Sequence, residues 1–251
     1  MADKIATREA YGNALAEFGA EYENLVVLDA DLAAATKTGT FKKKFPERFF
    51  DCGIAENNMI CVATGMSLCG KIPFASSFAM FAAGRSFEQV RNSIGYPHNN
   101  VKIGATHAGI TVGEDGATHQ CNEDIALMRT IPGMVIINPA DAVEARLAVK
   151  AAIEYVGPVY LRFGRMAVAN VNDESYEFVI GKGTKMADGD DVAIIATGIE
   201  VEQALLAKEM LAAEGINASV VNISTIKPLD EELIVEEAQL QSPDRVSGEV
   251  L

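Results

Sequence analysis

The stretch Met134-Val135-Ile136-Ile137-Asn138-Pro139-Ala140-Asp141 begins the strand–helix–strand pattern that decides the fold class. Its apolar first half predicts a buried strand, and the turn residues after it predict the start of a helix over about residues 141–155. A second apolar run, Pro158-Val159-Tyr160-Leu161, follows that helix directly. A strand, a helix and a strand in this order are typical of a parallel sheet.

The same alternation of apolar runs and helical spacing extends over the first two thirds of the chain. Apolar runs predict further strands at residues 25–28, 72–75 and 101–105. Helical spacing predicts helices at about residues 4–20, 55–69, 79–94 and 122–130. The pattern therefore predicts an α/β fold with a doubly wound, largely parallel sheet and helices on both faces. Ligands of such sheets gather at the carboxyl ends of the strands.

A polar, turn-rich segment from Ala169 to Tyr176 separates two predicted units. We expect a first domain over residues 1–168, a linker over 169–178 and a second α/β domain over 179–251. The second unit shows only two clear strands, at 192–196 and 219–223, around a helix over about 201–213. Residues 239–251 follow neither a strand period nor a helix period. We expect the second domain to be incomplete, because so few elements cannot close a core of their own.

The composition is that of a soluble globular protein with an acidic surface. Hydrophobic residues make up 49% of the chain and charged residues 22%, and the formal net charge is -14. Such a charge repels nucleic-acid backbones and anionic membrane surfaces, so we expect neither as a partner. The N-terminus has no apolar signal core and no apolar run is long enough to span a membrane, which predicts a cytoplasmic protein. The four cysteines match no zinc or redox spacing and are expected to be reduced, packed thiols.

The loop over residues 105–120 carries the residues best suited to chemistry. Two of the three histidines of the chain, His107 and His119, lie in it among several glycines, directly after a predicted strand. Histidine suits proton transfer near neutral pH, and glycine lets the backbone approach a ligand closely. The loop therefore predicts an active-site wall. A polar loop whose histidines only cap helices or complete turns fits the composition equally well. Cys121 beside this loop is a further candidate, because a nearby imidazole lowers the pKa of a thiol.

Two further segments each allow a structural and a functional interpretation. Glu56 precedes an apolar helix, where its carboxylate either caps the helix or has its pKa raised by burial and takes part in proton transfer. Phe78 and Phe81 stand at helical spacing, which is typical of a core and also of an aromatic platform for a planar ring.

In their order along the chain, these segments resemble the transketolase family of thiamine diphosphate enzymes over nearly the whole sequence. The resemblance is carried by Leu28-Asp29-Ala30-Asp31-Leu32, Gly53-Ile54-Ala55-Glu56, Gly113-Glu114-Asp115-Gly116-Ala117-Thr118-His119-Gln120 and Thr225-Ile226-Lys227-Pro228-Leu229-Asp230. It implies that the first domain binds the aminopyrimidine ring of thiamine diphosphate. By the same resemblance, Glu56 bonds this ring and favours its imino tautomer, Phe78 and Phe81 pack on it, and Asp31 lies near the cofactor at the subunit boundary.

The resemblance also assigns substrate-binding roles. His107 and His119 would contact sugar hydroxyls and the carbonyl oxygen and move protons, and Asp115 would bind a hydroxyl next to the donor carbonyl. Arg165 would hold the substrate phosphate, a task that suits its fork of donors, with Arg162 as the alternative. The implied reaction is transfer of a two-carbon ketol unit from a ketose phosphate to an aldose phosphate, as in the pentose phosphate pathway.

The chain departs from the family pattern in one respect that predicts a partner. Family members bind the diphosphate and its Mg²⁺ with a Gly-Asp-Gly motif, and this chain contains none. We therefore expect this chain to be the second subunit of a split transketolase. We expect it to be active in a heterotetramer with two copies of each subunit, in which the Mg²⁺ ligands lie mainly on the partner. A deoxyxylulose phosphate synthase-like subunit, a 2-oxoacid dehydrogenase-like subunit and a non-catalytic interaction subunit are the alternatives. The paired histidines argue against the dehydrogenase, and retention of the site residues argues against lost activity.

Overall fold

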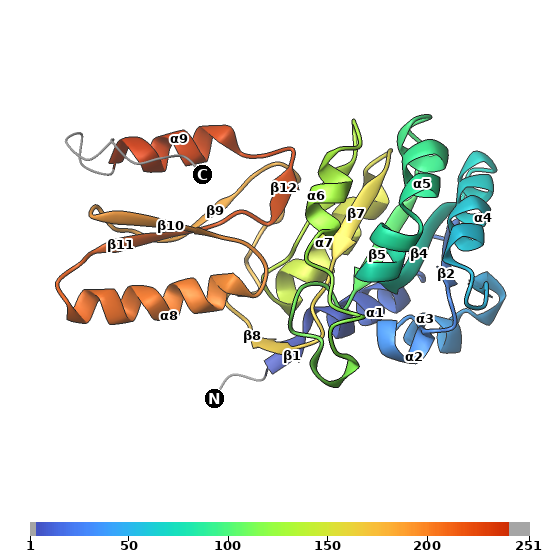
Figure 1. The fold of residues 1–251 in the computed structure, drawn as a ribbon, viewed down its shortest axis with the longest axis horizontal. Helices are drawn as coiled ribbons and strands as arrows, with labels where there is room; N and C mark the ends of the chain where they lie inside the picture. The colour runs from blue at the N-terminus through green and yellow to red at the C-terminus, as the bar shows by residue number, and fades with distance from the viewer. Residues whose placement is uncertain (1–3, 241–251) are drawn as a thin grey trace.

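A seven-stranded sheet forms the centre of the first unit (Figure 1). The computed structural model describes residues 4–240. The strands lie in the order β12-β6-β7-β5-β4-β2-β3, and all pair in parallel except β12, which runs antiparallel to β6. The predicted doubly wound, largely parallel sheet is confirmed. In chain order the strands are β2 (Leu25–Asp29), β3 (Phe49–Asp51), β4 (Ile72–Phe78), β5 (Lys102–Thr106), β6 (Val135–Ile137), β7 (Val159–Arg162) and β12 (Thr225–Lys227).

Helices cover both faces of this sheet because alternate strand residues point to opposite sides. On one face, Leu25 and Val27 of β2 pack with α1 (Thr7–Phe18), α3 (Gly39–Lys44) and α7 (Ala142–Glu154). On the other face, Val26 and Leu28 pack with α4 (Glu56–Leu68) and α6 (Asp124–Arg129). Two further short elements, α2 (Ala33–Thr36) and η1 (Pro46–Arg48), connect β2 to β3.

The single helix predicted at residues 79–94 is broken into three pieces. The structure has two π-helical segments, η2 (Met80–Arg85) and η3 (Val90–Gly95), on either side of a short α-helix, α5 (Phe87–Gln89). Gly84 and Ser86, both poor helix formers, lie at the first break. A π turn inserts an extra residue and so rotates the side chains that follow it about the helix axis. Arg85, the last residue of η2, lies beside the N-terminus of α4.

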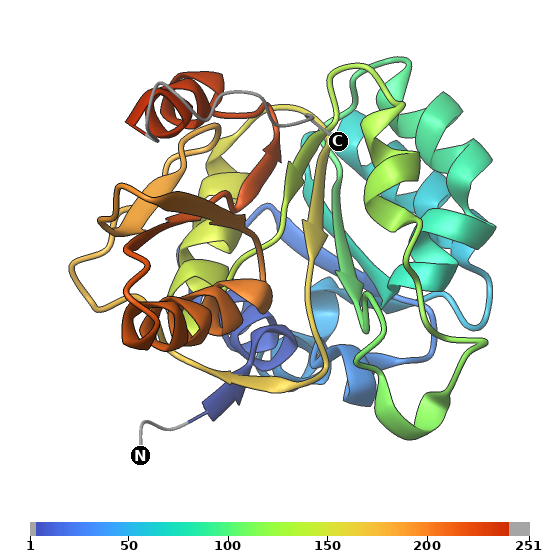
Figure 2. The same cartoon turned by 60° about the vertical axis from the view of Figure 1, so that its left-hand side comes forward.

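The second unit is built on a three-stranded sheet in the order β10-β11-β9 (Figure 2). Within the described residues, four strands follow the linker rather than the two expected. The prediction missed β9 (Thr184–Ala187) and β12, which are short and lack an apolar run. It also missed β3 and the antiparallel pair of β1 (Lys4–Ala6) and β8 (Ala167–Ala169). The remaining elements are β10 (Val192–Ala196), α8 (Glu200–Ala213), β11 (Ala218–Asn222) and α9 (Glu231–Leu240).

The expected domain boundaries at residues 168 and 178 stay a prediction, because β12 belongs by sequence to the second unit and by pairing to the first sheet. In the expected irregular tail, residues 239 and 240 are helical, and residues 241–251 lie outside the described part of the chain.

The linker is anchored to the first unit by a buried carboxylate. Asp141 caps α7 by accepting a bond from the backbone N–H of Glu144 (2.8 Å). Its other oxygen accepts bonds from the backbone N–H groups of Val171 (2.8 Å) and Asn172 (2.7 Å). Glu144 extends the network to the linker and the second unit, because its carboxylate accepts from the Tyr176 hydroxyl (2.6 Å) and from Asn222 Nδ2 (3.0 Å). Burial raises the pKa of Glu144.

We expect Asp141→Ala to lower the free energy of unfolding by about 3 to 5 kcal/mol. The change removes a helix cap, worth about 1 kcal/mol, and leaves buried N–H donors without acceptors, at about 1 to 3 kcal/mol each. Urea denaturation measures the effect, with Asp173→Ala as the matched control. Asp173 is an exposed linker aspartate that bonds only Ser175. Equal denaturation midpoints for the two variants would show that Asp141 does not anchor the linker.

Candidate active site

Four aromatic rings gather at the carboxyl ends of β4 and β5. The register pairs Phe78, the last residue of β4, with Thr106, the last residue of β5, so that Phe78 lies beside His107. The ring centroids of Phe78 and His107 are 3.8 Å apart, and those of Phe78 and Phe81 are 5.9 Å apart with an interplanar angle of 16°. His119 meets both phenylalanine rings edge-on, at 5.9 and 5.3 Å. The two histidines of the predicted active-site loop therefore face the two phenylalanines of the predicted aromatic platform.

Glu56 is buried next to this cluster. It is the first residue of α4 and is 2% exposed. Its carboxylate accepts a bond from Arg85 Nη1 (2.8 Å) and a longer one from Ser77 Oγ (3.4 Å). The Arg85 guanidinium also lies 4.4 Å from the centre of the Phe81 ring. Because both of these bonds come from side chains, the structure disfavours helix capping as the role of Glu56.

His107 is held as a neutral base. Its backbone has a φ of 57° and its side chain is 2% exposed. Nε2 lies 3.1 Å from Arg8 Nη1, and because arginine can only donate, Nε2 must accept. Nδ1 therefore carries the proton and lies 2.9 Å from Thr106 Oγ1. Burial, followed by the charge of Arg8, lowers the pKa of His107 to about 4.

Arg8 is a site residue that sequence reasoning missed. It comes from the N-terminal turn of α1, 99 positions before His107, and its Nη1 also bonds the Ala35 carbonyl (2.8 Å). Burial lowers the pKa of Arg8, and the charge of Arg165 lowers it further, while Glu9 and Asp115 act in the opposite direction.

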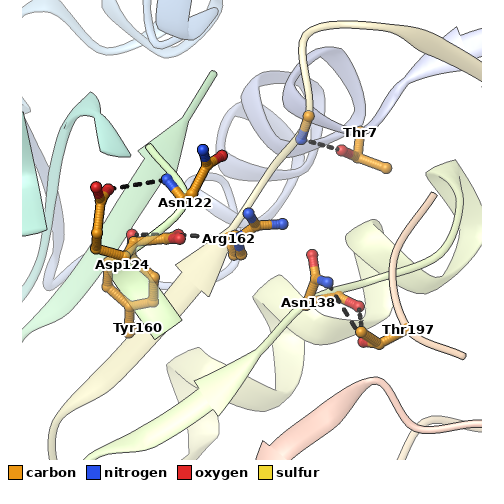
Figure 3. Close-up of polar contacts among 9 residues, drawn as sticks. Thr7, Asn122, Asp124, Asn138, Tyr160, Arg162 and Thr197 are labelled. Atoms are coloured by element: carbon orange, nitrogen blue, oxygen red, sulfur yellow. Dashed lines mark hydrogen bonds and ion pairs between the residues drawn. The ribbon is translucent and has the colours of Figure 1, made fainter. Parts of the chain in front are cut away.

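Asp115 and Arg165 lie close enough to His107 for their charges to act on its pKa. Arg165 pairs with Glu114, and its Nε lies 3.8 Å from Asp115 Oδ2. Gly113, which has a φ of 71°, leaves room for this arginine, because an added Cβ would lie 2.5 Å from Arg165 Nη1. Arg162, the alternative phosphate ligand, instead points its Nε at Asp124 (2.8 Å), as Figure 3 shows.

Among residues 4–240, Asp31 makes no hydrogen bond or ring contact with the aromatic cluster. It follows β2 with a φ of 63° and is exposed. Its backbone N–H donates to Asp51 Oδ1 (3.2 Å).

The cysteines differ from expectation. Cys61 and Cys69 are exposed rather than packed. Cys121 is buried, and burial raises its pKa to about 11, which opposes the thiolate that a catalytic cysteine needs. Within residues 4–240 no group of three or more His, Cys, Asp or Glu side chains is arranged to hold a metal ion. Across the same residues, no helix combines the length and the apolar character that a membrane span requires.

We expect His107 to make stability depend on pH between its unfolded pKa of 6.5 and its folded pKa of about 4. The folded state resists protonation, so stability is complete above pH 6.5 and falls by at most about 3 kcal/mol as the pH drops through that range. His107→Asn should flatten the dependence, since asparagine tolerates a positive φ. Urea denaturation across this range checks it. His98→Asn is the control, because His98 also has a φ of 57°. Parallel curves for the wild type and His107→Asn would contradict the assignment.

Two family profiles match the chain on either side of the linker. The profile described as the transketolase pyrimidine binding domain covers residues 3–170, and the transketolase C-terminal domain covers residues 181–245. The chain belongs to the transketolase family. Transketolases are in general thiamine diphosphate dependent, so the buried glutamate and the aromatic pair lie in a domain that this family uses for the pyrimidine ring.

Proteins from the split branch of the transketolase family are similar to the chain. A Methanocaldococcus jannaschii protein named for the C-terminal section of transketolase is 56% identical over 90% of this chain and 72% of its own length. A 6-deoxy-6-sulfo-D-fructose transketolase subunit of Clostridium sp. is 43% identical over 92% of this chain and 72% of its own length. A solved structure described as a split gene transketolase, inactive beta4 tetramer, has a TM-score of 0.88 and 55% identity, covering 94% of this chain and 76% of that one.

Proposed function

We propose that the chain is the pyrimidine-binding subunit of a split transketolase that moves a two-carbon ketol unit from a ketose phosphate to an aldose phosphate. The observation that carries this proposal is the position of Glu56, buried between Arg85 and Ser77 beside the Phe78 and Phe81 rings. A second subunit would complete the active site.

The residues present fit the aminopyrimidine ring of thiamine diphosphate. A buried carboxylate oxygen held only by a 3.4 Å bond from Ser77 is available to a ring nitrogen, and the two phenylalanines offer apolar faces for a planar ring. When bound, thiamine diphosphate supplies the carbon nucleophile that carries the ketol unit. Glu56 would hold and share the proton of the ring nitrogen. Arg85 would keep the carboxylate in place through its 2.8 Å bond.

We assign the polar residues of the cluster to two roles, proton transfer and substrate binding. His107 offers an accepting Nε2 and, with His119, would move protons on the sugar hydroxyl and the carbonyl oxygen. Asp115 would bind a hydroxyl next to the donor carbonyl. Arg165 would hold the substrate phosphate, and we add Arg8 to this role because the two guanidinium groups lie in the same region.

The absence of a Gly-Asp-Gly motif from the sequence supports a partner that binds the diphosphate and Mg²⁺. We infer a heterotetramer with two copies of each subunit, working in the cytoplasm. The similar split gene transketolase described as inactive assembles from one kind of chain, which supports the need for the second subunit.

The test is an assay of ketol transfer with and without the companion chain. The tagged protein is purified from its native cells, and the proteins that elute with it in stoichiometric amount are identified by mass spectrometry. We expect a companion with a Gly-Asp-Gly motif, activity of the complex only with thiamine diphosphate and Mg²⁺, and no activity of the isolated chain. Activity of the isolated chain would refute the split arrangement. An inactive complex would favour the non-catalytic interaction subunit.

A further inference from the structure

A cavity of about 320 Å³ lies where the two units meet, and none of the residues placed in the active site lines it. Its walls come from the carboxyl ends of β5, β6 and β7 in the first unit and of β10 in the second. This is the edge of an α/β sheet at which ligands bind. The polar lining residues are Thr111, Asn122, Asn138, Arg162, Thr197 and Glu200.

Arg162 is fixed so that its terminal nitrogens face this space. Its Nε donates to Asp124 Oδ2 (2.8 Å), and the Tyr160 hydroxyl donates to the same oxygen (3.0 Å). Asp124 is fully buried, so it holds one side of the guanidinium firmly. In Figure 3 the terminal nitrogens point away from Asp124, toward the space between Asn122 and Asn138. Within residues 4–240 these nitrogens make no hydrogen bond, so their donors are available to a ligand.

The opposite wall joins the two units through an amide and a hydroxyl. Asn138 Nδ2 donates to Thr197 Oγ1 (3.3 Å), as Figure 3 shows, and Asn138 is only 6% exposed. Gly198, with a φ of 58°, lets the second unit approach closely, because an added Cβ would lie 2.5 Å from Asn138 Nδ2. A ligand here would therefore touch both units at once.

The charges around the cavity favour a neutral ligand over an anion. Asp124 offsets the charge of Arg162, and Glu200 adds an exposed carboxylate at the rim. Arg162 and Asn122 offer donors, and Glu200 offers acceptors, which suits vicinal hydroxyl groups that both accept and donate. The apolar lining residues suit the C–H face of a sugar ring, and they are Ile110, Ile125, Pro139 and Ile199.

We propose that this cavity binds a neutral, hydroxyl-rich ligand of about the size of a monosaccharide. Arg162 of the first unit and Glu200, at the rim in the second unit, hold this ligand. The site is separate from the one that would carry out ketol transfer and does not depend on it. Its wall includes residues 108–111, which come directly after His107, so an occupied cavity would steady the loop that positions His107.

Saturation-transfer NMR on the full chain with unphosphorylated D-ribose and D-glucose tests the proposal. We expect transfer to at least one sugar, and binding about tenfold weaker in Arg162→Lys, which keeps a charge beside Asp124 but loses the forked donors. Ile110→Trp should abolish transfer, because Ile110 is 66% exposed at the cavity and a larger side chain fills it without removing a buried charge. Asp115→Ala, which alters the active site alone by removing the carboxylate proposed to bind a sugar hydroxyl, should leave transfer unchanged. Hydrogen exchange should slow at residues 108–111 and 197–200 when the sugar is bound.

Several outcomes would overturn the proposal. No transfer to either sugar means that the cavity holds water only. Transfer that survives both Arg162→Lys and Ile110→Trp, or that disappears in Asp115→Ala, places the sugar elsewhere. The last measurement is phosphorus NMR with inorganic phosphate. If phosphate binds in a way that depends on Arg162 and neither sugar binds, the cavity is an anion site.

Discussion

Glu56→Gln is expected to lower the turnover of the assembled enzyme by about 100- to 10,000-fold, the range typical of a lost proton-transfer group. Glutamine keeps the size of the side chain and loses the carboxylate that would share a proton with the pyrimidine ring. The fold should survive, because the ion-pair partner Arg85 is 47% exposed and can be solvated. Steady-state assays with saturating thiamine diphosphate and excess companion measure the change.

Glu88→Gln is the matched control for this experiment. Glu88 is an exposed carboxylate on α5 that bonds Gln89 and Asn92 and does not contact the cluster. Unfolding midpoints of both variants should stay close to that of the wild type. If Glu56→Gln retains turnover within a few-fold of the wild type, Glu56 does not have the role assigned to it.

Arg165→Met is expected to raise the KM for phosphorylated sugars by about 10- to 100-fold, because a charge-assisted bond to phosphate contributes about 1.5 to 3 kcal/mol. The KM for an unphosphorylated sugar should change little, since the Arg165 guanidinium would bind only the phosphate. Arg8→Met should act in the same direction and should also raise the folded pKa of His107, because the Arg8 charge contributes to lowering it.

Arg91→Met is the control for the arginine variants, since Arg91 is exposed and bonds its neighbour Asn92. Initial rates over a range of ribose 5-phosphate and of ribose separate the two effects. Equal increases in KM for both sugars would mean that Arg165 orders the loop rather than holding the phosphate.

The sequence predicted the long, regular parts of the fold and left out the short ones. Each of the five apolar runs predicted as strands in the first domain became a strand, because strands buried on both faces of a parallel sheet are largely apolar along their length. Strands of three or four residues such as β9 and β12 lack that signal, and tertiary pairing alone makes them strands. The π-helical turns at η2 and η3 likewise result from packing, and the spacing of apolar residues in the sequence does not indicate them.

The candidate site was predictable where its residues share a local motif and hidden where they meet across the chain. The loop with His107 and His119 could be recognised from its composition, and Asp115 within it was singled out by the resemblance to the transketolase family. The bonds from Arg8 to His107 and from Arg85 to Glu56 join residues 99 and 29 positions apart, and only the folded sheet brings them together. The expected place of Asp31 near a cofactor at the subunit boundary stays a prediction.

The position of β12 bears on how the chain is made. Its residues 225–227 pair with Ile136 and Ile137, so β6 keeps one side unpaired until synthesis has passed residue 227. A fragment cut at the linker would expose those backbone groups permanently, and an open strand edge is a template for aggregation. The bonds from Lys227 Nζ to the Arg129 and Ile131 carbonyls would be lost with it. The two units are therefore best expressed as one piece, because the strand that finishes the first sheet leaves the ribosome only after β9, β10 and β11 of the second unit.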